Sequence, residues 1–528
     1  MRRFHSYGPV DCERHFCVKR GDLLQKCLDY LVDDPARGGH YFTIWAPRQT
    51  GKTWLMREAV KEIRSRYGDM FLVGAMSMQG VVMKDDEPEE AFLARAPMLM
   101  QLAFGLEMDA PDSWEQWQMA FSKNKKFFDR PVILIIDEFD SLPTKVIDNL
   151  VRLFRNIYHY RETFNLHSLA LIGVRAVLGI ESERGSPFNI QRSLHVPNLT
   201  KDEVSDLFEQ YRKESGQKVD PVVVEKVYEV TRGQPGLVSW FGELLTEKFN
   251  PGKDKSIDPA VWERTYVRAC TTEWNNTVLN LIKKAKGEYR PHVFELFASS
   301  NIPFSLDADW CNYLYLHGII DHESSIDFLG RETEICRFSN PFVQLSLYNA
   351  LTYDLVGDRT PILALDPLDD LSDVFDNPTL AVSALIRRYK EYLKRLKAKG
   401  INPWKDQPRR VDMHLTEAAG HFHLYAWLRE AVGRYCVISP EFPTGNGKVD
   451  LHLNCGGKTG IIEIKSFTDA RQAKDAIRQA AGYAAQLGLS SVVLVLFAPV
   501  EDESVLERLS GEQTLDGIVV TSFAIACC

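Results

Sequence analysis

The chain has 528 residues, of which 45% are hydrophobic and 26% charged, and a formal net charge of −9. This length predicts roughly three or four domains, and the acidic balance excludes a global attraction to nucleic acid, so such a contact needs a local basic patch. No apolar run is long enough to span a membrane or follows the basic N-terminus as in a signal peptide, which predicts a cytoplasmic protein without a membrane partner.

The ten cysteines are scattered and form no CxxC pair. This distribution predicts reduced thiols, as in a cytosolic protein. Cys12 and Cys17 lie near His5 and His15, but their spacing matches no standard zinc pattern.

The first helix is predicted at residues 18–28. A phosphate-binding loop is predicted further along the chain, between a strand and a second helix. Residues 41–45 are an apolar run typical of a buried strand, and residues 54–60 have helical spacing. Backbone N–H groups of such a turn face an anion, a lysine adds a charge, and a threonine hydroxyl can reach Mg²⁺. We therefore expect a nucleotide to be bound by Ala46, Arg48, Gln49, Thr50, Gly51, Lys52 and Thr53, with Thr53 also at the metal. Ala46 replaces the first glycine of the usual pattern, and a chance Gly-Lys-Thr turn is the alternative.

A strand at residues 70–77 and a helical stretch at 87–105 come next. Five apolar residues, 132–136, then predict a fully buried parallel strand that ends in Asp137 and Glu138. Ligands bind at this end of the strands in open α/β sheets. We expect Asp137 to hold Mg²⁺ and Glu138 to orient the attacking water as the catalytic residue. A strand that ends in a solvated acidic turn is the alternative.

A fourth strand, residues 168–174, ends in Arg175. Arg175 could contact the γ-phosphate of the nucleotide or form a structural salt bridge. Further on, Thr200 and Glu203 have the spacing of a capping box at a helix start. The turn Gly233-Gln234-Pro235-Gly236 then separates two helical stretches.

Together with residues 185–190, these motifs resemble the AAA-ATPase-like proteins of prokaryotes, relatives of the AAA+ and STAND ATPases, over about residues 1–350. The resemblance implies a P-loop ATPase core with a parallel sheet at 1–195, a helical lid at 196–285 and a winged-helix-like region at 286–355. It also implies that Gly233 and Pro235 lie against the nucleotide, although a plain helix break would have the same sequence. Arg20 could cover the base or be a surface arginine.

Two features of this part concern partners. The winged-helix-like region could bind DNA, but its few basic residues favour packing within or between subunits. Arg152, Arg155 and Arg161 could act on a neighbouring subunit or be ordinary surface arginines. A nucleotide-dependent homo-oligomer is therefore expected.

Residues 356–405 are predicted to be a linker with a helix. Pro361, Pro367 and Pro378 stand among many aspartates, and a helix follows at about 379–399.

The last part of the chain has a second set of candidate residues. A helix is predicted at 414–432 and strands at 448–453 and 460–465. Side chains alternate along a strand, so Glu463 and Lys465 face the same side, and a hairpin would bring Asp450 beside them. Such a cluster binds a hard cation through oxygen ligands and leaves the lysine near an activated water.

The spacing Asp450-x(12)-Glu463-x-Lys465 resembles the PD-(D/E)XK nuclease family, with Val449 in place of the proline. Glu417 on the preceding helix, and Gln479 and Tyr483 on the following one, extend the resemblance. It implies an α/β restriction-endonuclease-like domain at 406–528. Glu417, Asp450 and Glu463 would hold Mg²⁺ or Mn²⁺, and Lys465 would stabilise the developing charge. Arg471, Lys474 and Arg478 could contact a phosphate backbone or form a solvated surface.

The combined prediction is an α/β multidomain protein in which ATP binding or hydrolysis licenses a metal-dependent nuclease, with DNA as the expected partner. A role in anti-phage or mobile-element defence rests on analogy alone. One alternative is a nucleotide switch that binds DNA or a partner without cutting, and another is an ATP-driven remodeller whose nuclease fold only guides DNA.

Overall fold

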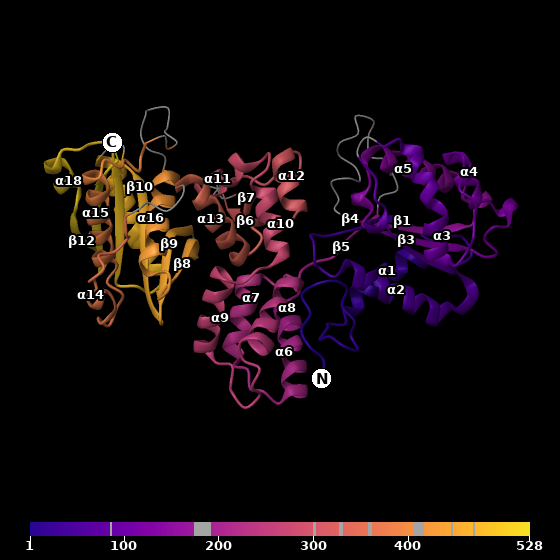
Figure 1. The fold of residues 1–528 in the computed structure, drawn as a ribbon, viewed down its shortest axis with the longest axis horizontal. Helices are drawn as coiled ribbons and strands as arrows, with labels where there is room; N and C mark the ends of the chain where they lie inside the picture. Colours follow the sequence, from indigo (N-terminus) through magenta and orange to yellow (C-terminus); the bar gives the residue numbers. More distant parts are fainter. Residues whose placement is uncertain are drawn as a thin grey trace. The chain divides into compact units, whose positions relative to one another are not determined.

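The structure, a computed structural model, describes residues 1–84, 87–173, 192–298, 302–326, 331–356, 362–405, 407, 417–444, 447–467 and 470–527. It contains two compact units (Figure 1). The first consists of Met1–Trp262 and Ser305–Ile320, and the second of Glu263–Phe304 and Asp321–Cys528.

The first unit is built on a five-stranded parallel sheet with the order β2-β3-β4-β1-β5. This agrees with the predicted α/β fold with a parallel sheet. The strands are β1 Tyr41–Trp45, β2 Leu72–Ser77, β3 Val132–Asp137, β4 Leu166–Gly173 and β5 Arg192–His195. β3 and β4 lie inside the sheet and are buried along their whole length, as the continuous apolar runs predict.

Helices cover both faces of this sheet. Alternate strand residues point to opposite faces, so Ile133 and Ile135 pack with α1 and α2, whereas Leu134 and Ile136 pack with α3, α4 and α5. Figure 1 shows where these helices lie in the ribbon. The helices are α1 Gly21–Val32, α2 Lys52–Tyr67, α3 Ala96–Phe104, α4 Trp114–Ala120 and α5 Thr144–His159. A 3₁₀ segment, Glu89–Arg95, precedes α3, so only the second half of the stretch predicted at 87–105 is α-helical.

A group of helices follows the sheet: α6 Lys201–Ser215, α7 Pro221–Thr231, α8 Pro235–Glu243 and α9 Pro259–Thr271, whose residues from Glu263 on are assigned to the second unit. The predicted capping box is confirmed, because the Glu203 N–H donates to Thr200 Oγ1 at 3.1 Å and the Thr200 N–H donates to Glu203 Oε2 at 2.8 Å. A short helix, α12 Asp309–Leu316, also belongs to the first unit.

The second unit contains a six-stranded mixed sheet with the order β12-β13-β11-β10-β9-β8. Its strands are β8 Val437–Thr444, β9 Gly447–Cys455, β10 Lys458–Ser466, β11 Ser491–Ala498, β12 Gly511–Leu515 and β13 Ile518–Ala526. β8, β9 and β10 form an antiparallel meander, and β11 then pairs parallel with β10. With α16 Glu417–Val432 before the meander and α17 Ala470–Gln486 after it, the chain order is α-β-β-β-α-β.

The remaining elements of this unit precede or flank that sheet. They are α10 Asn276–Ala285, α11 Arg290–Ala298, β6 Ile320–Ile326, β7 Glu332–Phe338, α13 Pro341–Val356, α14 Ser372–Phe375, α15 Val382–Ala398 and α18 Glu503–Leu509. β6 and β7 form a two-stranded sheet.

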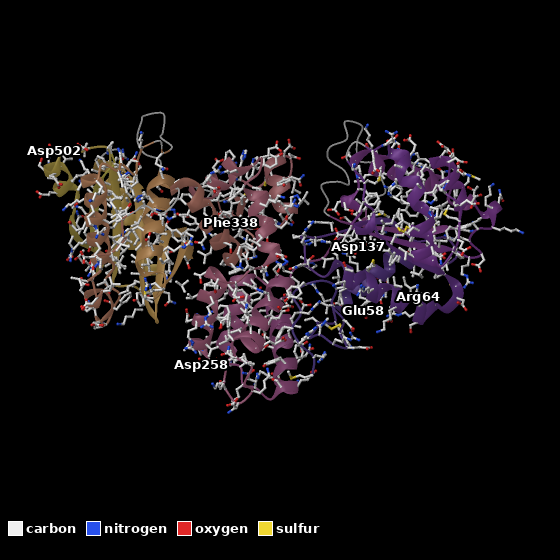
Figure 2. The ribbon with its side chains drawn as sticks, viewed as in Figure 1. Glu58, Arg64, Asp137, Asp258, Phe338 and Asp502 are labelled. Carbon is white, nitrogen blue, oxygen red and sulfur yellow. A yellow bond between two sulfur atoms is a disulfide. The ribbon has the colours of Figure 1, made fainter. Side chains whose placement is uncertain are left out.

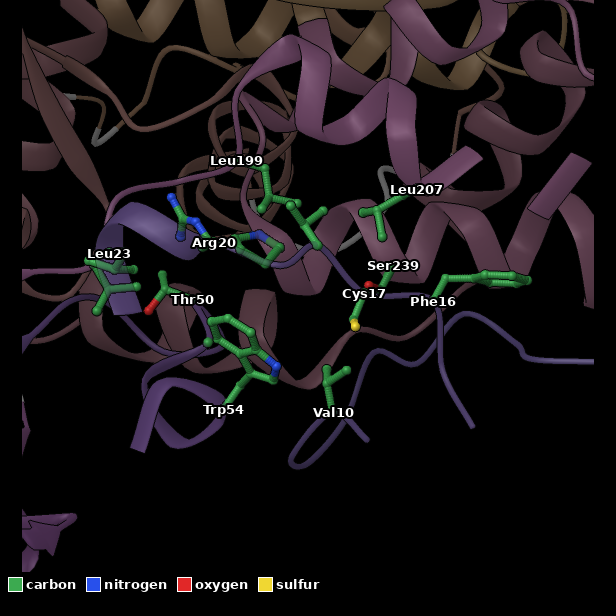
Figure 3. Close-up of a pocket in the computed structure, with 14 residues that line it drawn as sticks. Val10, Phe16, Cys17, Arg20, Leu23, Thr50, Trp54, Leu199, Leu207 and Ser239 are labelled. Atoms are coloured by element: carbon green, nitrogen blue, oxygen red, sulfur yellow. The ribbon is translucent and has the colours of Figure 1, made fainter. Parts of the chain in front are cut away.

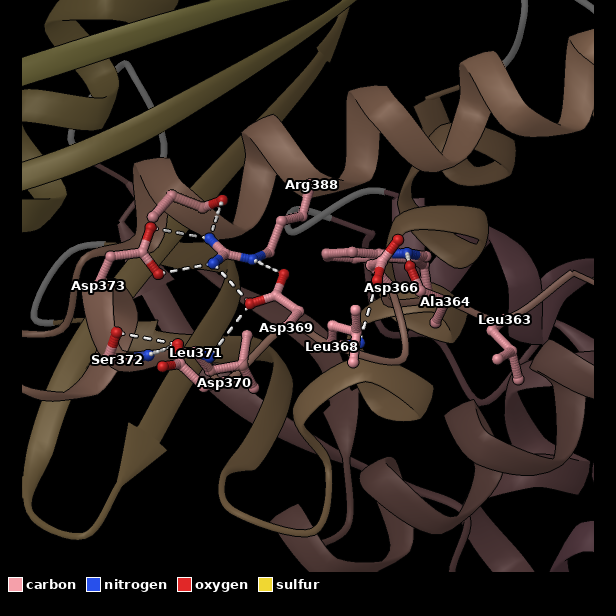
Figure 4. Close-up of polar contacts among 12 residues, drawn as sticks. Leu363, Ala364, Asp366, Leu368, Asp369, Asp370, Leu371, Ser372, Asp373 and Arg388 are labelled. Atoms are coloured by element: carbon pink, nitrogen blue, oxygen red, sulfur yellow. Dashed lines mark hydrogen bonds and ion pairs between the residues drawn. The ribbon is translucent and has the colours of Figure 1, made fainter.

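An ion-pair network holds part of the predicted linker. Arg388 on α15 reaches Asp369 at 2.5 Å and Asp373 at 2.7 Å, and its guanidinium bonds both oxygens of each carboxylate (Figure 4). The Arg388 guanidinium lowers the pKa of Asp369. Paired charges with several hydrogen bonds fix geometry, so the side chains of Asp369 and Asp373 are held at α15.

Two disulfides contradict the expectation that all cysteines are reduced. Cys12 is bonded to Cys17, and Cys436 to Cys455. The second pair follows from strand register, because Val437 and Asn454 are opposite each other and the two cysteines flank that position. The Cys12–Cys17 disulfide closes a short turn near His5 and His15. The ring centroids of these two histidines are stacked 3.9 Å apart. Cys12 and Cys17 are close in sequence, whereas Cys436 and Cys455 are brought together only by the pairing of β8 with β9.

None of the helices in the described ranges is both long and apolar enough to cross a bilayer.

Candidate functional site

The turn between β1 and α2 closes around the ammonium of Lys52. Its Nζ donates to the carbonyl oxygens of Ala46 at 2.7 Å and Pro47 at 2.8 Å, and Thr50 Oγ1 donates to Pro47 at 2.9 Å. Gly51 precedes α2 with φ +98°, a backbone conformation that favours glycine. Burial lowers the pKa of Lys52, and the carboxylates of Asp140, Glu138 and Asp137 oppose that effect. An ammonium at a helix N-terminus lined by backbone N–H groups suits a phosphate.

Thr53 and Asp137 meet across the sheet edge. Thr53 Oγ1 donates to Asp137 Oδ2 at 2.9 Å, and Asp137, at the end of β3, is only 6% exposed. Asp137 is labelled in Figure 2. The next residue, Glu138, has φ +55°, and its pKa is raised by burial and by the carboxylates of Asp140 and Asp137. A hydroxyl and a carboxylate in contact are hard oxygen ligands suited to Mg²⁺.

The helical segment after the sheet contacts this turn directly. Gln234 Nε2 donates to the Arg48 carbonyl at 3.1 Å, and the Gly236 N–H donates to the Gln49 carbonyl at 3.1 Å. A Cβ on Gly236 would stand 2.3 Å from Gln49 Oε1. The side chain of Arg48 is exposed. The sequence predicts a turn that includes Gln234 and Gly236, but it assigns a contact with the nucleotide only to Gly233 and Pro235.

A largely apolar pocket opens beside Thr50 and Gly51 (Figure 3). Three segments distant in sequence supply its walls, which include Val10, Phe16, Cys17, Val18, Arg20, Leu23, Trp54, Val196, Leu199, Leu207, Pro235 and Ser239. Arg20 lines the pocket, but its guanidinium donates to the carbonyls of Pro197 at 2.7 Å and Asn198 at 3.2 Å and pairs with Glu203 at 3.4 Å. Arg20 therefore joins the pocket wall to the start of α6.

The other arginines of this unit are placed differently. Arg175 and the motif at 185–190 lie outside the described residues. Arg161 donates to the Gly39 carbonyl at 3.2 Å, and its guanidinium stacks on the ring of Tyr158. These contacts give Arg161 a structural role. Arg152 is exposed on α5.

A second cluster lies in the second unit. In the antiparallel pair of β9 and β10, Ile462 lies opposite Leu451, so the next residues, Glu463 and Asp450, are neighbours on adjacent strands. Glu417 is the first residue of α16. Lys465 Nζ is 3.0 Å from Glu463 Oε1, 3.2 Å from Glu417 Oε1 and 3.8 Å from Asp450 Oδ2. The structure thus brings all four predicted residues together around one ammonium.

Burial controls the protonation of this cluster. It raises the pKa of Glu463 to about 8, with a further contribution from the Asp450 charge, and it also raises the pKa values of Asp450 and Glu417. Burial alone would lower the pKa of Lys465, but the three carboxylates outweigh it and raise that pKa. Lys465 is therefore charged at neutral pH, and the acids share its single positive charge.

The donor set of this cluster fits a hard cation. Glu463 is 1% exposed, and its Oε2 is buried without a hydrogen-bond partner among the residues that the structure describes. A buried carboxylate oxygen without a donor is poorly stabilised and is a suitable cation ligand. Within the described ranges no group of three or more His, Cys, Asp or Glu side chains is already arranged as a metal site. Here the ammonium of Lys465 stands between the carboxylates.

The following helix borders the cluster. Gln479 Nε2 donates to the Tyr483 hydroxyl at 2.8 Å, and burial raises the pKa of Tyr483. Arg471, Lys474 and Arg478 are exposed on the same helix, and Arg478 pairs with Asp475 at 3.0 Å.

Three solved structures are similar to a part of this chain. A Walker-type ATPase of Pyrococcus abyssi is 16% identical, with 65% of this chain and 99% of that chain covered and a TM-score of 0.45. The Orc1 protein of Aeropyrum pernix, solved in complex with DNA, is 15% identical, with 63% and 92% covered and a TM-score of 0.32. RuvB of Thermotoga maritima is 14% identical, with 60% and 92% covered and a TM-score of 0.34.

No curated protein matches the chain. The model of a family described as an AAA-like domain matches residues 5–250, which contain the loop around Lys52, the Thr53–Asp137 contact and the turn at Pro235. Residues 5–250 of this chain are therefore similar to an AAA-like domain.

Proposed function

We propose that this AAA-like protein binds and hydrolyses ATP to regulate a metal-dependent nuclease in its C-terminal part, which cleaves phosphodiester bonds of nucleic acid, chiefly DNA. The observation that carries the nuclease proposal is the convergence of Glu417, Asp450, Glu463 and Lys465 within an α-β-β-β-α-β unit. Their spacing resembles the PD-(D/E)XK family, and the order of elements supports that resemblance.

Each residue has a distinct task in the proposal. Asp450, Glu463 and Glu417 would hold Mg²⁺ or Mn²⁺, which supplies Lewis-acid stabilisation of the phosphate and a more acidic bound water. Lys465 carries a positive charge, which suits it to orient water or to stabilise charge on the phosphate. The exposed Arg471, Lys474 and Arg478 would hold the nucleic-acid backbone.

The ATP site would act as the control element. In the proposal, Lys52 holds the phosphates, Thr53 and Asp137 hold Mg²⁺, and Glu138 activates water. Arg175 would sense the γ-phosphate. The proposal also includes domain limits at 195, 285, 355 and 405 and a winged-helix-like region at 286–355. It further includes a nucleotide-dependent homo-oligomer, a cytoplasmic location and a role in defence. These parts rest on resemblance.

The test uses the full chain with ATP, Mg²⁺ or Mn²⁺, and linear DNA, circular DNA or RNA. Cleavage is expected to need the metal, to disappear in Asp450→Asn and Lys465→Ala, and to lose its ATP dependence in Lys52→Ala. Glu512→Gln, an exposed acid on β12 of the same sheet, is the matched control and should cut normally. The proposal is wrong if no nucleic acid is cut under any of these conditions.

A second function is favoured by the ammonium that stands between the carboxylates. In that case the second unit binds DNA without cutting it, and the protein is a nucleotide switch. Gel-shift binding that is equal for the wild type and Asp450→Asn, with no product at any metal concentration, would select this function.

A further inference from the structure

A buried histidine on α16 holds the backbone of Asp450. His421 lies four residues, about one helical turn, after Glu417, and its Nε2 is 2.9 Å from the carbonyl oxygen of Asp450. A carbonyl oxygen only accepts, so Nε2 carries a proton and donates this hydrogen bond. Helix α16 therefore serves the cluster twice, with Glu417 at the ammonium of Lys465 and His421 at the strand that bears Asp450.

The second ring nitrogen of His421 fixes the orientation of the imidazole. Nδ1 lies 2.8 Å from the hydroxyl of Tyr348, a fully buried residue of α13. With the proton on Nε2, the neutral ring accepts at Nδ1 and the Tyr348 hydroxyl donates. The ring of Tyr348 also stacks on Phe422, the residue after His421, with the centroids 4.3 Å apart. These contacts set both the tautomer of His421 and the direction of its N–H.

Asp450 occupies a position at which the sheet itself gives less support. The pairs between β9 and β10 end at Leu451 and Ile462, so Asp450 is the first residue beyond them. There the N–H of Ile464 donates to Asp450 Oδ2 at 2.5 Å. Asp450 is thus fixed at two atoms, its backbone oxygen by α16 and its carboxylate by β10. A histidine that only filled space would need no bond to the backbone of a candidate cation ligand.

We propose that His421 is a positioning residue, which holds Asp450 at a fixed distance from Glu417 so that both carboxylates reach one divalent cation. The inference rests on the proposed nuclease function. In this role His421 contacts neither the cation nor the nucleic acid, and it acts through Asp450. Partners that orient a metal ligand in this way typically contribute a factor of about 10 to 100 to metal affinity.

The first measurement titrates the full chain with Mn²⁺ in the absence of nucleotide and follows the free ion by electron paramagnetic resonance. The relevant site is the one that disappears in Asp450→Asn. His421→Phe keeps a ring of similar size and removes both hydrogen bonds, so it is expected to weaken Mn²⁺ binding at this site by roughly tenfold to a hundredfold. His421→Gln can still donate an amide N–H to the Asp450 carbonyl and should recover most of the affinity.

His423→Phe is the matched control. His423 is a buried histidine of the same helix, and its Nδ1 also bonds to a tyrosine hydroxyl, that of Tyr389 at 2.6 Å. Its replacement leaves the bond between His421 and Asp450 in place, so Mn²⁺ affinity should equal that of the wild type. The proposal is overturned if His421→Phe binds Mn²⁺ as the wild type does, if His423→Phe loses as much affinity, or if His421→Gln is no better than His421→Phe.

A second measurement needs no metal and separates this inference from the proposed function. Amide exchange of Ile464, resolved from overlapping peptides by mass spectrometry, reports on its bond to Asp450 Oδ2. His421→Phe should speed this exchange roughly tenfold, the net worth of about one hydrogen bond, and leave the exchange of Ile462 on the same strand unchanged.

The two measurements fail in different ways. If the wild type has no Mn²⁺ site that Asp450→Asn removes, the metal role in the proposed function is wrong, and the cation part of this inference fails with it. The exchange of Ile464 then still decides whether His421 holds Asp450. Equal exchange of Ile464 in the wild type and His421→Phe, or equally faster exchange of Ile462, overturns the positioning role whatever the metal does.

Discussion

The ammonium of Lys465 lies 3.0 Å from Oε1 of Glu463, while Oε2 of the same carboxylate is buried and, in the described part of the chain, has no hydrogen-bond partner. One positive charge thus faces three carboxyl groups. One oxygen of Glu463 lacks a hydrogen bond to any described residue. A metal cation can bind to these carboxyl groups only if the ammonium moves away or the protonated acids lose their protons. Replacement of Lys465 therefore tests how the charges of the cluster are balanced.

Lys465→Ala is expected to destabilise the second unit by about 1–3 kcal/mol in the absence of metal. Breaking a buried ion pair leaves charges without compensation, and the 24% exposure of the lysine side chain reduces the effect below that of a fully buried pair. Mn²⁺ should then stabilise the variant more than it stabilises the wild type, because the cation replaces the lost charge. Urea unfolding with and without Mn²⁺ measures both effects.

Lys474→Ala, an exposed lysine on α17, is the control and should change neither stability nor the response to Mn²⁺. A Lys465→Ala protein as stable as the wild type, with the same response to Mn²⁺, would contradict the proposed role of the cluster.

Glu138→Gln is expected to reduce ATP hydrolysis by roughly a hundredfold or more while ATP affinity stays close to that of the wild type. The residue follows Asp137 and is half-buried next to two other carboxylates, which suits a group that handles a proton of water. Steady-state hydrolysis and equilibrium ATP binding separate the two effects. Glu107→Gln, an exposed acid of the same unit, should leave both unchanged. A parallel loss of affinity would instead indicate that Glu138 shapes the loop.

Gly236→Ala is expected to weaken ATP binding by roughly tenfold, because the new Cβ would stand 2.3 Å from Gln49 Oε1 and 2.7 Å from Gln49 Cβ. The clash pushes on the P-loop from the helix that contacts it. Isothermal titration with ATP checks the effect. Gly21→Ala provides the control, since a Cβ there meets nothing within 4 Å. If Gly236→Ala binds ATP normally, Gln49 can move aside without cost and the contact does not set loop geometry.

Some of these relationships follow from the sequence and some do not. The apolar run before Asp137 is continuous because β3 is buried on both faces, so its type and its end could be predicted. Period-two alternation also predicts that Glu463 and Lys465 face the same side. β8 was missed because it contains Pro440 and Pro443, which a strand tolerates only at positions such as a sheet edge, where β8 lies. β5 was missed because that short edge strand is mostly polar.

The pocket was missed for a different reason. Its walls join residues such as Phe16, Trp54 and Leu207, which only the folded chain brings together. No local pattern marks Trp54 as different from any other aromatic residue on a helix. What distinguishes it from Trp114, whose indole Nε1 is also buried without a partner among the described residues, is its place in the pocket wall, and that property exists only in three dimensions.

His423 is expected to make the stability of the second unit depend on pH. It is buried, and Tyr389 Oη lies 2.6 Å from its Nδ1. Burial lowers its pKa from 6.5 to about 4. The folded state therefore favours the neutral ring, so its contribution is complete above pH 6.5 and is lost as the pH falls towards 4. Between pH 7.5 and pH 5 the loss amounts to about 2 kcal/mol for this group.

The comparison of wild type and His423→Gln isolates this contribution from those of other titrating groups. Urea unfolding of the second unit at both pH values should show that the wild type loses about 2 kcal/mol more than the variant between pH 7.5 and pH 5. His159→Gln, which replaces an exposed histidine, should keep the full pH dependence of the wild type. Equal pH dependence in the wild type and His423→Gln would mean that the ring is protonated in the folded state, in conflict with its burial against Tyr389.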